Sequence, residues 1–236
     1  MLILGENKLK VLNLINRFGV IGYRQLFDYF EGQISQGAIY KILSDLHENE
    51  LIKKGNVGRI FYCYITPNAE AIIDKPMYNF KTVNKTEVIH DLRVNDFILK
   101  QYKSAVATDK YKYVDFTTER ELTDEQLIER EDSFKSNNLT RNVEKIKRNI
   151  PDGMLNLETQ DGRLLRIAIE YEFTQKSTRR YKEILGRYQK QYDRNEIATV
   201  TYIYKGSRVR HKIEQVMSEN NYNFNITFRN ADNIFD

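Results

Sequence analysis

The chain has 236 residues, enough for one large domain or two small ones. Hydrophobic residues make up 41% of it, an ordinary share for a protein with a packed core, and the formal net charge is +4. This mildly basic balance permits a nucleic acid as partner without requiring one. A single cysteine, Cys63, excludes a disulfide framework and a cysteine-based zinc cluster. Because the sequence shows neither a signal peptide nor a membrane span, we expect a soluble cytoplasmic protein.

Residues 1–75 carry the periodicities of a small helical domain with a hairpin. Apolar residues recur at helical spacing in three stretches, and the third follows a serine that can cap it. Two strand-like runs flank a glycine-containing tip, which predicts an antiparallel hairpin. The expected elements are helices at 6–18, 23–30 and 35–49, strands at 51–54 and 59–65, and a last helix that starts at Thr66-Pro67.

Three helices followed by a hairpin resemble the winged helix-turn-helix domain of many regulators. In that family the third helix enters the major groove and the hairpin contacts the DNA backbone. The resemblance implies that outward-facing residues of these elements bind DNA, namely Gln36, Tyr40, Lys41, Ser44, Lys53, Lys54 and Arg59. The alternative is a winged helix that binds another protein, since residues 1–75 hold nine Lys/Arg against eight Asp/Glu.

The segment after this domain breaks the pattern at Pro76, so we place the boundary there, with a second domain at 76–236. Residues 85–102 then predict a long helix and 111–118 a strand. The run 115–132 has eight acids and two arginines, typical of a solvated acidic surface. The polar and then basic run 133–149 predicts either a flexible loop or an arm that contacts DNA.

The most informative stretch starts at Pro151-Asp152, which precedes a strand at 153–159. A turn at Gln160-Asp161-Gly162 predicts a hairpin with the strand 163–173, whose nearly continuous apolar run suggests burial on both faces. Glu170 and Glu172 lie two apart and therefore point to the same side of that strand. With Asp152 they form an oxygen-rich site that suits Mg²⁺ or Mn²⁺, and Lys176 could hold a phosphate or the attacking water.

The stretch 176–194 predicts an amphipathic helix that begins directly after this acidic strand. It has seven basic residues against two acids. A solvated basic face is the ordinary interpretation, but its position beside the carboxylates favours contact with a phosphodiester backbone. The residues expected to make that contact are Arg179, Arg180, Lys182 and Arg187. A strand at 198–204, a helix at 208–218 and a strand at 223–228 complete the expected order.

Pro151-Asp152 followed by Glu170-x-Glu172 resembles the motif of the PD-(D/E)XK nuclease superfamily. Glu172 stands where that motif usually has its lysine, and Lys176 is a candidate for a migrated lysine. The resemblance implies a restriction-endonuclease-like mixed sheet flanked by helices, so the fold class is α+β or α/β with a winged helix first. It also implies that Asp152, Glu170 and Glu172 are the metal ligands.

Over nearly its full length the chain resembles the replication-relaxation family of plasmid and conjugative-element proteins, related to mobilisation-protein C type relaxases. The matching features are the winged helix, a helix with His90-Asp91, a strand ending at Thr118-Glu119, Pro151-Asp152-Gly153 and Glu170-x-Glu172-x-Thr174. This resemblance implies further site candidates, which are Glu119, His90, Asp91 and Thr174.

The implied function is that of a Mg²⁺- or Mn²⁺-dependent DNA nickase acting at a plasmid or mobile-element origin in replication or mobilisation. Water is the expected attacking group, with a tyrosine as the alternative, although sixteen tyrosines offer no basis for choosing one. The second hypothesis is a non-catalytic DNA-binding regulator of a mobile element with a vestigial nuclease domain. Both take double-stranded DNA as partner, and a homodimer is the usual state of such proteins on palindromic sites.

Overall fold

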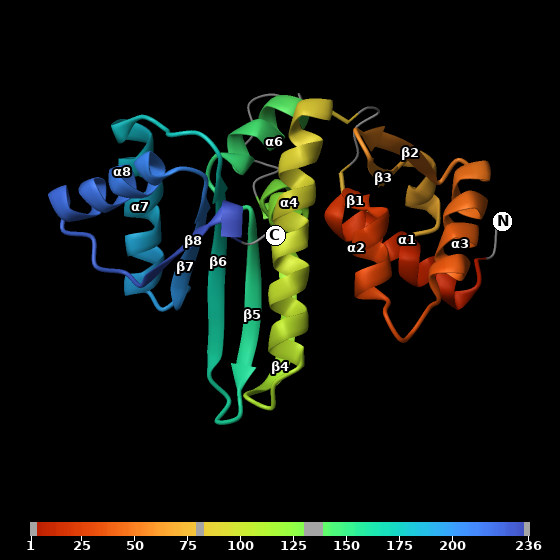
Figure 1. Ribbon diagram of the computed structural model, residues 1–236, viewed down its shortest axis with the longest axis horizontal. Helices are drawn as coiled ribbons and strands as arrows, with labels where there is room; N and C mark the ends of the chain where they lie inside the picture. Colours follow the sequence, from red (N-terminus) through yellow and green to blue (C-terminus); the bar gives the residue numbers. More distant parts are fainter. Residues whose placement is uncertain (1–3, 79–82, 130–138, 234–236) are drawn as a thin grey trace. The chain divides into compact units, whose positions relative to one another are not determined.

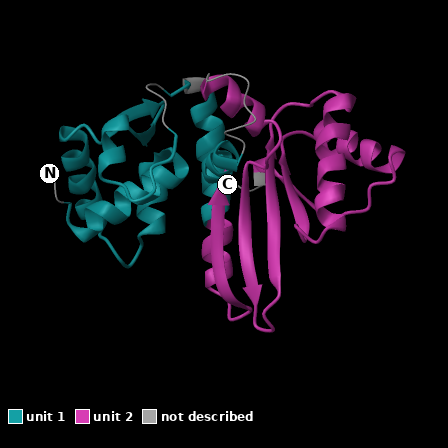
Figure 2. Cartoon of the chain, turned by 180° about the vertical axis from the view of Figure 1, so that it is seen from behind, with its two compact units in different colours: residues 1–99, 120–134 teal, residues 100–119, 135–236 magenta. Residues whose placement is uncertain are grey.

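The computed structural model describes residues 4–78, 83–129 and 139–233 (Figure 1). The chain divides into two compact units: unit 1 comprises residues 1–99 and 120–134, and unit 2 comprises residues 100–119 and 135–236 (Figure 2). Both units combine helices with an open sheet, so the protein is a mixed α and β structure as expected. None of the helices in the described ranges is both long and apolar enough to cross a lipid bilayer.

Unit 1 packs short helices against a three-stranded antiparallel sheet with the order β1-β3-β2. The helix α4 runs from unit 1 into unit 2. The chain returns to unit 1 after the strand at Tyr111–Thr118, where α5 begins. The elements in chain order are α1 (Glu6–Phe18), β1 (Val20–Gly22), α2 (Tyr23–Tyr29), α3 (Gln36–Glu48), β2 (Ile52–Val57), β3 (Ile60–Ile65), a 3-10 helix (Pro67–Ala71), α4 (Lys85–Val106) and α5 (Glu119–Glu129).

The predicted helices of unit 1 begin and end where the local chemistry requires. Gly19 ends α1 with a φ of 74°, a conformation that glycine adopts without steric cost. Ser35 caps α3, because its hydroxyl accepts a hydrogen bond from the backbone N–H of Ala38 at 3.3 Å. The strand β1 was not predicted, since three residues are too few to show an alternating pattern.

The hairpin of unit 1 is tighter than the sequence indicated. Gly55 and Asn56, expected at the tip, belong to β2 and pair with Tyr62 and Phe61 of β3. The ring of Tyr62 lies so close to Gly55 that a Cβ atom there would come within 2.6 Å of the phenol oxygen. Glycine at position 55 therefore allows a buried tyrosine to cross the hairpin.

Unit 2 is built on a five-stranded mixed sheet with the order β4-β5-β6-β7-β8. The strands β4, β5 and β6 are antiparallel neighbours, whereas β6, β7 and β8 run parallel. Besides the last turns of α4, its elements are β4 (Tyr111–Thr118), α6 (Leu139–Lys147), β5 (Gly153–Thr159), β6 (Leu164–Glu172), α7 (Thr178–Asp193), β7 (Thr199–Tyr204), α8 (Ser207–Glu219), β8 (Ile226–Asn230) and a 3-10 helix (Ala231–Asn233).

One face of the unit 2 sheet is covered by α7 and α8, which form a single core with the parallel strands. Tyr181 and Leu185 of α7 and Ile213 of α8 pack there with Ala168 of β6 and Tyr202 of β7. The core explains why these helices carry apolar residues at helical spacing although both are strongly polar elsewhere. It also sets α7 against the end of β6 that carries the two glutamates.

Three expectations for the chain after residue 110 were wrong or incomplete. The strand β6 is buried only over residues 168–172, and Leu164 at its start is 73% exposed, so burial on both faces does not hold along its length. Part of the acidic run forms α5 and part of the polar-basic run forms α6. In α5 a buried arginine, Arg120, takes the place of an apolar residue by donating to the carbonyl of Asn16 at 2.8 Å.

Candidate functional site

The β5–β6 hairpin positions the three predicted carboxylates of unit 2. The β5–β6 ladder pairs Gly153 with Ile169, and the backbone N–H of Asp152 donates to the Ile169 carbonyl at 3.0 Å. Asp152 directly precedes β5, and its carboxylate lies near enough to Glu170 to raise the pKa of that residue. Glu172 lies two residues further along β6 and points to the same face as Glu170.

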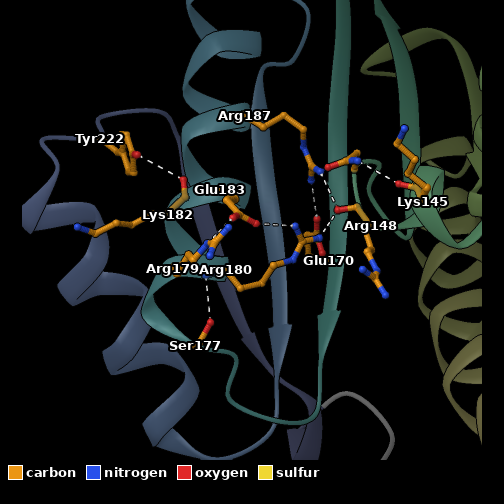
Figure 3. A network of polar contacts seen from close by, with 11 residues as sticks. Lys145, Arg148, Glu170, Ser177, Arg179, Arg180, Lys182, Glu183, Arg187 and Tyr222 are labelled. Atoms are coloured by element: carbon orange, nitrogen blue, oxygen red, sulfur yellow. Dashed lines mark hydrogen bonds and ion pairs between the residues drawn. The ribbon is translucent and has the colours of Figure 1, made fainter. Parts of the chain in front are cut away.

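Glu170 is buried by two consecutive residues of α7. Only 8% of it is exposed, and its Oε1 accepts a hydrogen bond from the Tyr188 hydroxyl. Nη2 of Arg187 lies 3.2 Å from the same oxygen, and the guanidinium carbon stands 4.6 Å from the centre of the Tyr188 ring. Figure 3 shows Arg187 reaching down from α7 to this carboxylate. Helix α7 thus supplies both a counter-charge and a hydroxyl to the central glutamate.

Negative charge is concentrated around Glu170. Burial, and then the neighbouring Asp152 carboxylate, raise the pKa of Glu170 to about 7. Asp152 is itself oriented, because its Oδ2 accepts a hydrogen bond from the backbone N–H of Tyr171 at 2.6 Å. The β6–β7 register places Tyr202 beside Glu170, and its buried hydroxyl has no hydrogen-bond partner among the described residues. The site therefore contains both crowded carboxylates and an unsatisfied polar group.

Glu172 is held by the lysine that the sequence singled out. Its buried carboxylate forms an ion pair with Nζ of Lys176, four residues further along. The backbone N–H of Lys176 donates to the Tyr181 hydroxyl at 3.2 Å, which fixes the connection between β6 and α7. The lysine charge therefore lies at the third carboxylate. Thr174 is exposed in the same connection.

A fourth acid, Glu119, follows directly after β4. The β4–β5 ladder ends with Thr118 opposite Gly153. Glu119, which follows β4, and Asp152, which precedes β5, therefore lie at the same end of the sheet. The Glu119 carboxylate forms an ion pair with Nζ of Lys147 in α6 at 2.6 Å. Strand register thus places Glu119 at the end of the sheet where β5 begins, and its ion pair with Lys147 was not predicted.

The predicted DNA-binding residues of α7 differ in their accessibility. Arg179 and Arg180 both form ion pairs with Glu183 at 3.2 Å, and Arg180 also donates to the carbonyl of Arg148 (Figure 3). The side chain of Arg187 is only 19% exposed and is directed to Glu170. Lys182 is exposed, as are Lys145 and Arg148 near the end of α6. Arg148 is therefore an exposed base near the carboxylates, because its carbonyl accepts from Arg180 and Arg187, whereas Lys182 points away from Glu170 (Figure 3).

The donor chemistry of the site fits a hard divalent cation. Carboxylate oxygens are the ligands that Mg²⁺ and Mn²⁺ prefer, and a cation would offset both the burial and the Asp152 charge that raise the pKa of Glu170. Within the described ranges, however, no three His, Cys, Asp or Glu side chains are gathered closely enough to hold a metal ion as they stand. Glu170 and Glu172 are engaged by Arg187 and Lys176 instead.

The remaining predicted residues lie in unit 1. Most of those assigned to DNA binding are exposed on α3 and the β2–β3 hairpin, and Ser44 is half-buried; the exposed ones are Gln36, Tyr40, Lys41, Lys53, Lys54 and Arg59. His90 and Asp91 lie on the part of α4 that belongs to unit 1, with Nδ1 and Oδ1 separated by 3.6 Å. The carboxylates of the candidate site, in contrast, all belong to unit 2.

Sequence reasoning missed two tyrosines that surround Glu170. Tyr188 lies within the predicted amphipathic helix 176–194 and Tyr202 within the predicted strand 198–204, but the sequence indicated no role for either at the site. A buried tyrosine generally finds a partner for its hydroxyl, so Tyr188 on the buried side of an amphipathic helix was a signal of a polar group opposite it. Comparisons of the chain with protein families, with characterised proteins and with solved structures found no match.

Proposed function

We propose that this protein is a DNA-binding, metal-dependent DNA nickase that acts at a plasmid or mobile-element origin. In this proposal unit 2 is a PD-(D/E)XK nuclease domain and unit 1 is a winged helix. The element order of unit 2 supports the first assignment, since the end of a helix, a strand, a second helix, an antiparallel hairpin, a helix and a parallel strand succeed one another within the unit. The second rests on three helices followed by the β2–β3 hairpin.

The observation that carries the proposal is the position of Asp152 next to Glu170, with Glu172 two residues further along the same strand and Arg148 exposed nearby. These three carboxylates would hold Mg²⁺ or Mn²⁺. When bound, such an ion supplies positive charge that activates water and stabilises the phosphoryl oxygens of a phosphodiester. Arg148, exposed beside the site, would contact the DNA backbone there, and Lys182 would contact it on the outer side of α7.

The chain itself orients the carboxylates and places positive charge among them. The backbone N–H of Tyr171 fixes Asp152, while Tyr188 and Arg187 fix Glu170. Lys176 forms an ion pair with Glu172. If Glu172 bound a metal ion instead, Lys176 would be released to contact the scissile phosphate. Glu170 must be ionised to act as a ligand, so its raised pKa predicts weaker metal binding below about pH 7.

The alternative function is a non-catalytic DNA-binding regulator of a mobile element. Two ion pairs favour it, because Lys176 and Arg187 already neutralise Glu172 and Glu170 without a metal. In that case the sheet face is a structural salt-bridge network, and DNA binding is independent of divalent ions.

Calorimetric titration with Mn²⁺ at about pH 8 separates the two functions. The nickase proposal predicts binding by the wild type and loss of binding in Asp152→Asn. The matched control is Asp161→Asn, which changes an exposed aspartate at the far end of the same hairpin and should bind as the wild type does. Equal Mn²⁺ binding by all three proteins, or none by the wild type, would favour the regulator.

A further inference from the structure

Four aromatic rings of unit 1 form a continuous cluster that the core does not enclose. Tyr23 and Phe27 of α2, Tyr40 of α3 and Phe61 of β3 make up this cluster, which we term the aromatic platform. Ring centres are 6.0 Å apart for Tyr23 and Tyr40, 6.1 Å for Tyr23 and Phe61, and 5.0 Å for Phe27 and Tyr40. Tyr40 is 53% exposed and Phe61 60% exposed, so both present aromatic surface to solvent.

The rings of the platform are not stacked in parallel, and two of them are more than half exposed. The interplanar angles of the three contacts are 69°, 39° and 57°, so no ring covers another by parallel stacking. The core of unit 1 is formed by other residues of the same elements, such as Ile39 of α3 and Cys63 of β3, which are fully buried. Exposed aromatic surface that is contiguous across three elements is unusual for a surface without a partner.

The surroundings of the platform are basic. Lys41, Lys54 and Arg59 are exposed on the same α3 and hairpin elements, and none forms an ion pair with a described residue, whereas Lys53 pairs with Tyr64 on the opposite face of the hairpin. In the hairpin register Lys54 stands opposite Cys63, which places it on the same sheet face as Phe61. The positive charge of this surface complements a polyanion better than an apolar protein face.

We infer that the aromatic platform binds the unpaired bases of single-stranded DNA, with the surrounding lysines and arginine contacting its phosphates. Aromatic rings set in a basic surface are the combination that binds single strands, because every base has a π-face that can stack. A duplex hides its base faces inside the helix, so ring faces such as that of Phe61 gain stacking only from an open strand. The inference deepens the proposed function by assigning unit 1 an open strand in addition to duplex DNA, and rests on that function for the choice of DNA.

Fluorescence anisotropy of the full chain in EDTA tests the inference. The probes are a labelled oligothymidylate of about 20 nucleotides and a labelled mixed-sequence duplex of the same length. We expect the single strand to bind more tightly, and Phe61→Leu and Tyr40→Leu each to weaken its binding roughly 5- to 100-fold. Phe61→Tyr should bind as the wild type does because it keeps a ring.

The matched control is Ile60→Ala, which removes an exposed side chain, 51% accessible, from the opposite face of the same strand. This variant should bind the oligothymidylate normally, and circular dichroism should show that every variant melts as the wild type does. Full binding by Phe61→Leu would overturn the inference, since leucine keeps apolar surface but cannot stack. A duplex that binds as tightly as the single strand and loses as much affinity in Phe61→Leu would also overturn it, as would a dimer that forms through the platform and excludes the oligonucleotide.

Failure of this inference is distinguishable from failure of the proposed function. Binding is measured without metal, so an inactive carboxylate site leaves it unchanged. Conversely, a protein that cleaves DNA with a metal but whose aromatic platform does not prefer the single strand would refute the role of that platform and leave the nickase proposal standing.

Discussion

Ionisation of Glu170 should dominate the pH dependence of stability in unit 2. The carboxyl is 8% exposed, and burial together with the Asp152 charge raises its pKa from 4.5 to about 7. The folded protein therefore holds this proton to a higher pH than the unfolded chain does. Between about pH 4.5 and about pH 7 the native state binds more protons, so the free energy of unfolding contributed by this group falls as the pH rises.

The size of the effect follows from the gap between the two pKa values. At about 1.4 kcal/mol per pH unit, the loss across this range is on the order of 3 kcal/mol. Above about pH 7 the contribution should be constant, since both states are then ionised. Glu170→Gln cannot ionise, so the variant should lack this part of the pH dependence.

Urea unfolding followed by circular dichroism at about pH 5 and about pH 8 measures the difference. We expect the wild type to lose stability relative to Glu170→Gln between these values. The control, Glu144→Gln, changes an exposed acid of α6 and should retain the wild-type dependence. Parallel pH profiles for the wild type and Glu170→Gln would refute the reasoning, because they would mean that Glu170 titrates alike in both states.

Two further substitutions test packing and charge. Arg187→Met should destabilise the protein by roughly 3–5 kcal/mol at neutral pH, because it leaves Glu170 buried without its counter-charge, and adding Glu170→Gln should recover most of the loss in thermal melts. Gly55→Ala should cost on the order of 1–3 kcal/mol, since its Cβ would meet the buried ring of Tyr62. Gly37 lies in an exposed turn of α3 with no atom near the new Cβ, so Gly37→Ala should instead stabilise the protein by about 1 kcal/mol. Equal melting temperatures for the two alanine variants would contradict the hairpin packing.

Periodicity and turn chemistry were sufficient to predict the elements that build the candidate site. The turn at Gln160-Asp161-Gly162 indicated an antiparallel hairpin, and this hairpin brings Asp152 near Glu170. The two-residue period of a strand then places Glu172 on the same face as Glu170. These relations depend only on neighbours in the chain and on one hairpin, which is why the sequence reveals them.

Other features depend on contacts between distant segments, and no local pattern carries them. The acidic helix α5 buries Arg120 and Thr123 rather than apolar residues, so its buried side has no hydrophobic signature. Arg187 has the spacing of a solvated base, yet it turns inward because a buried carboxylate lies beneath it. The basic composition of α7 could be read from the sequence, but the division between its exposed and engaged residues could not.

Conversion of supercoiled DNA to open circles tests the central claim most directly. The substrate is a plasmid carrying the origin of the protein's own element, incubated with Mg²⁺, Mn²⁺ or EDTA. The wild type and Asp161→Asn should produce open circles only with a divalent ion, and Asp152→Ala should produce none while still shifting the DNA in a gel. Intact supercoils under every condition, with a gel shift that is indifferent to metal, would contradict the nickase and leave the regulator.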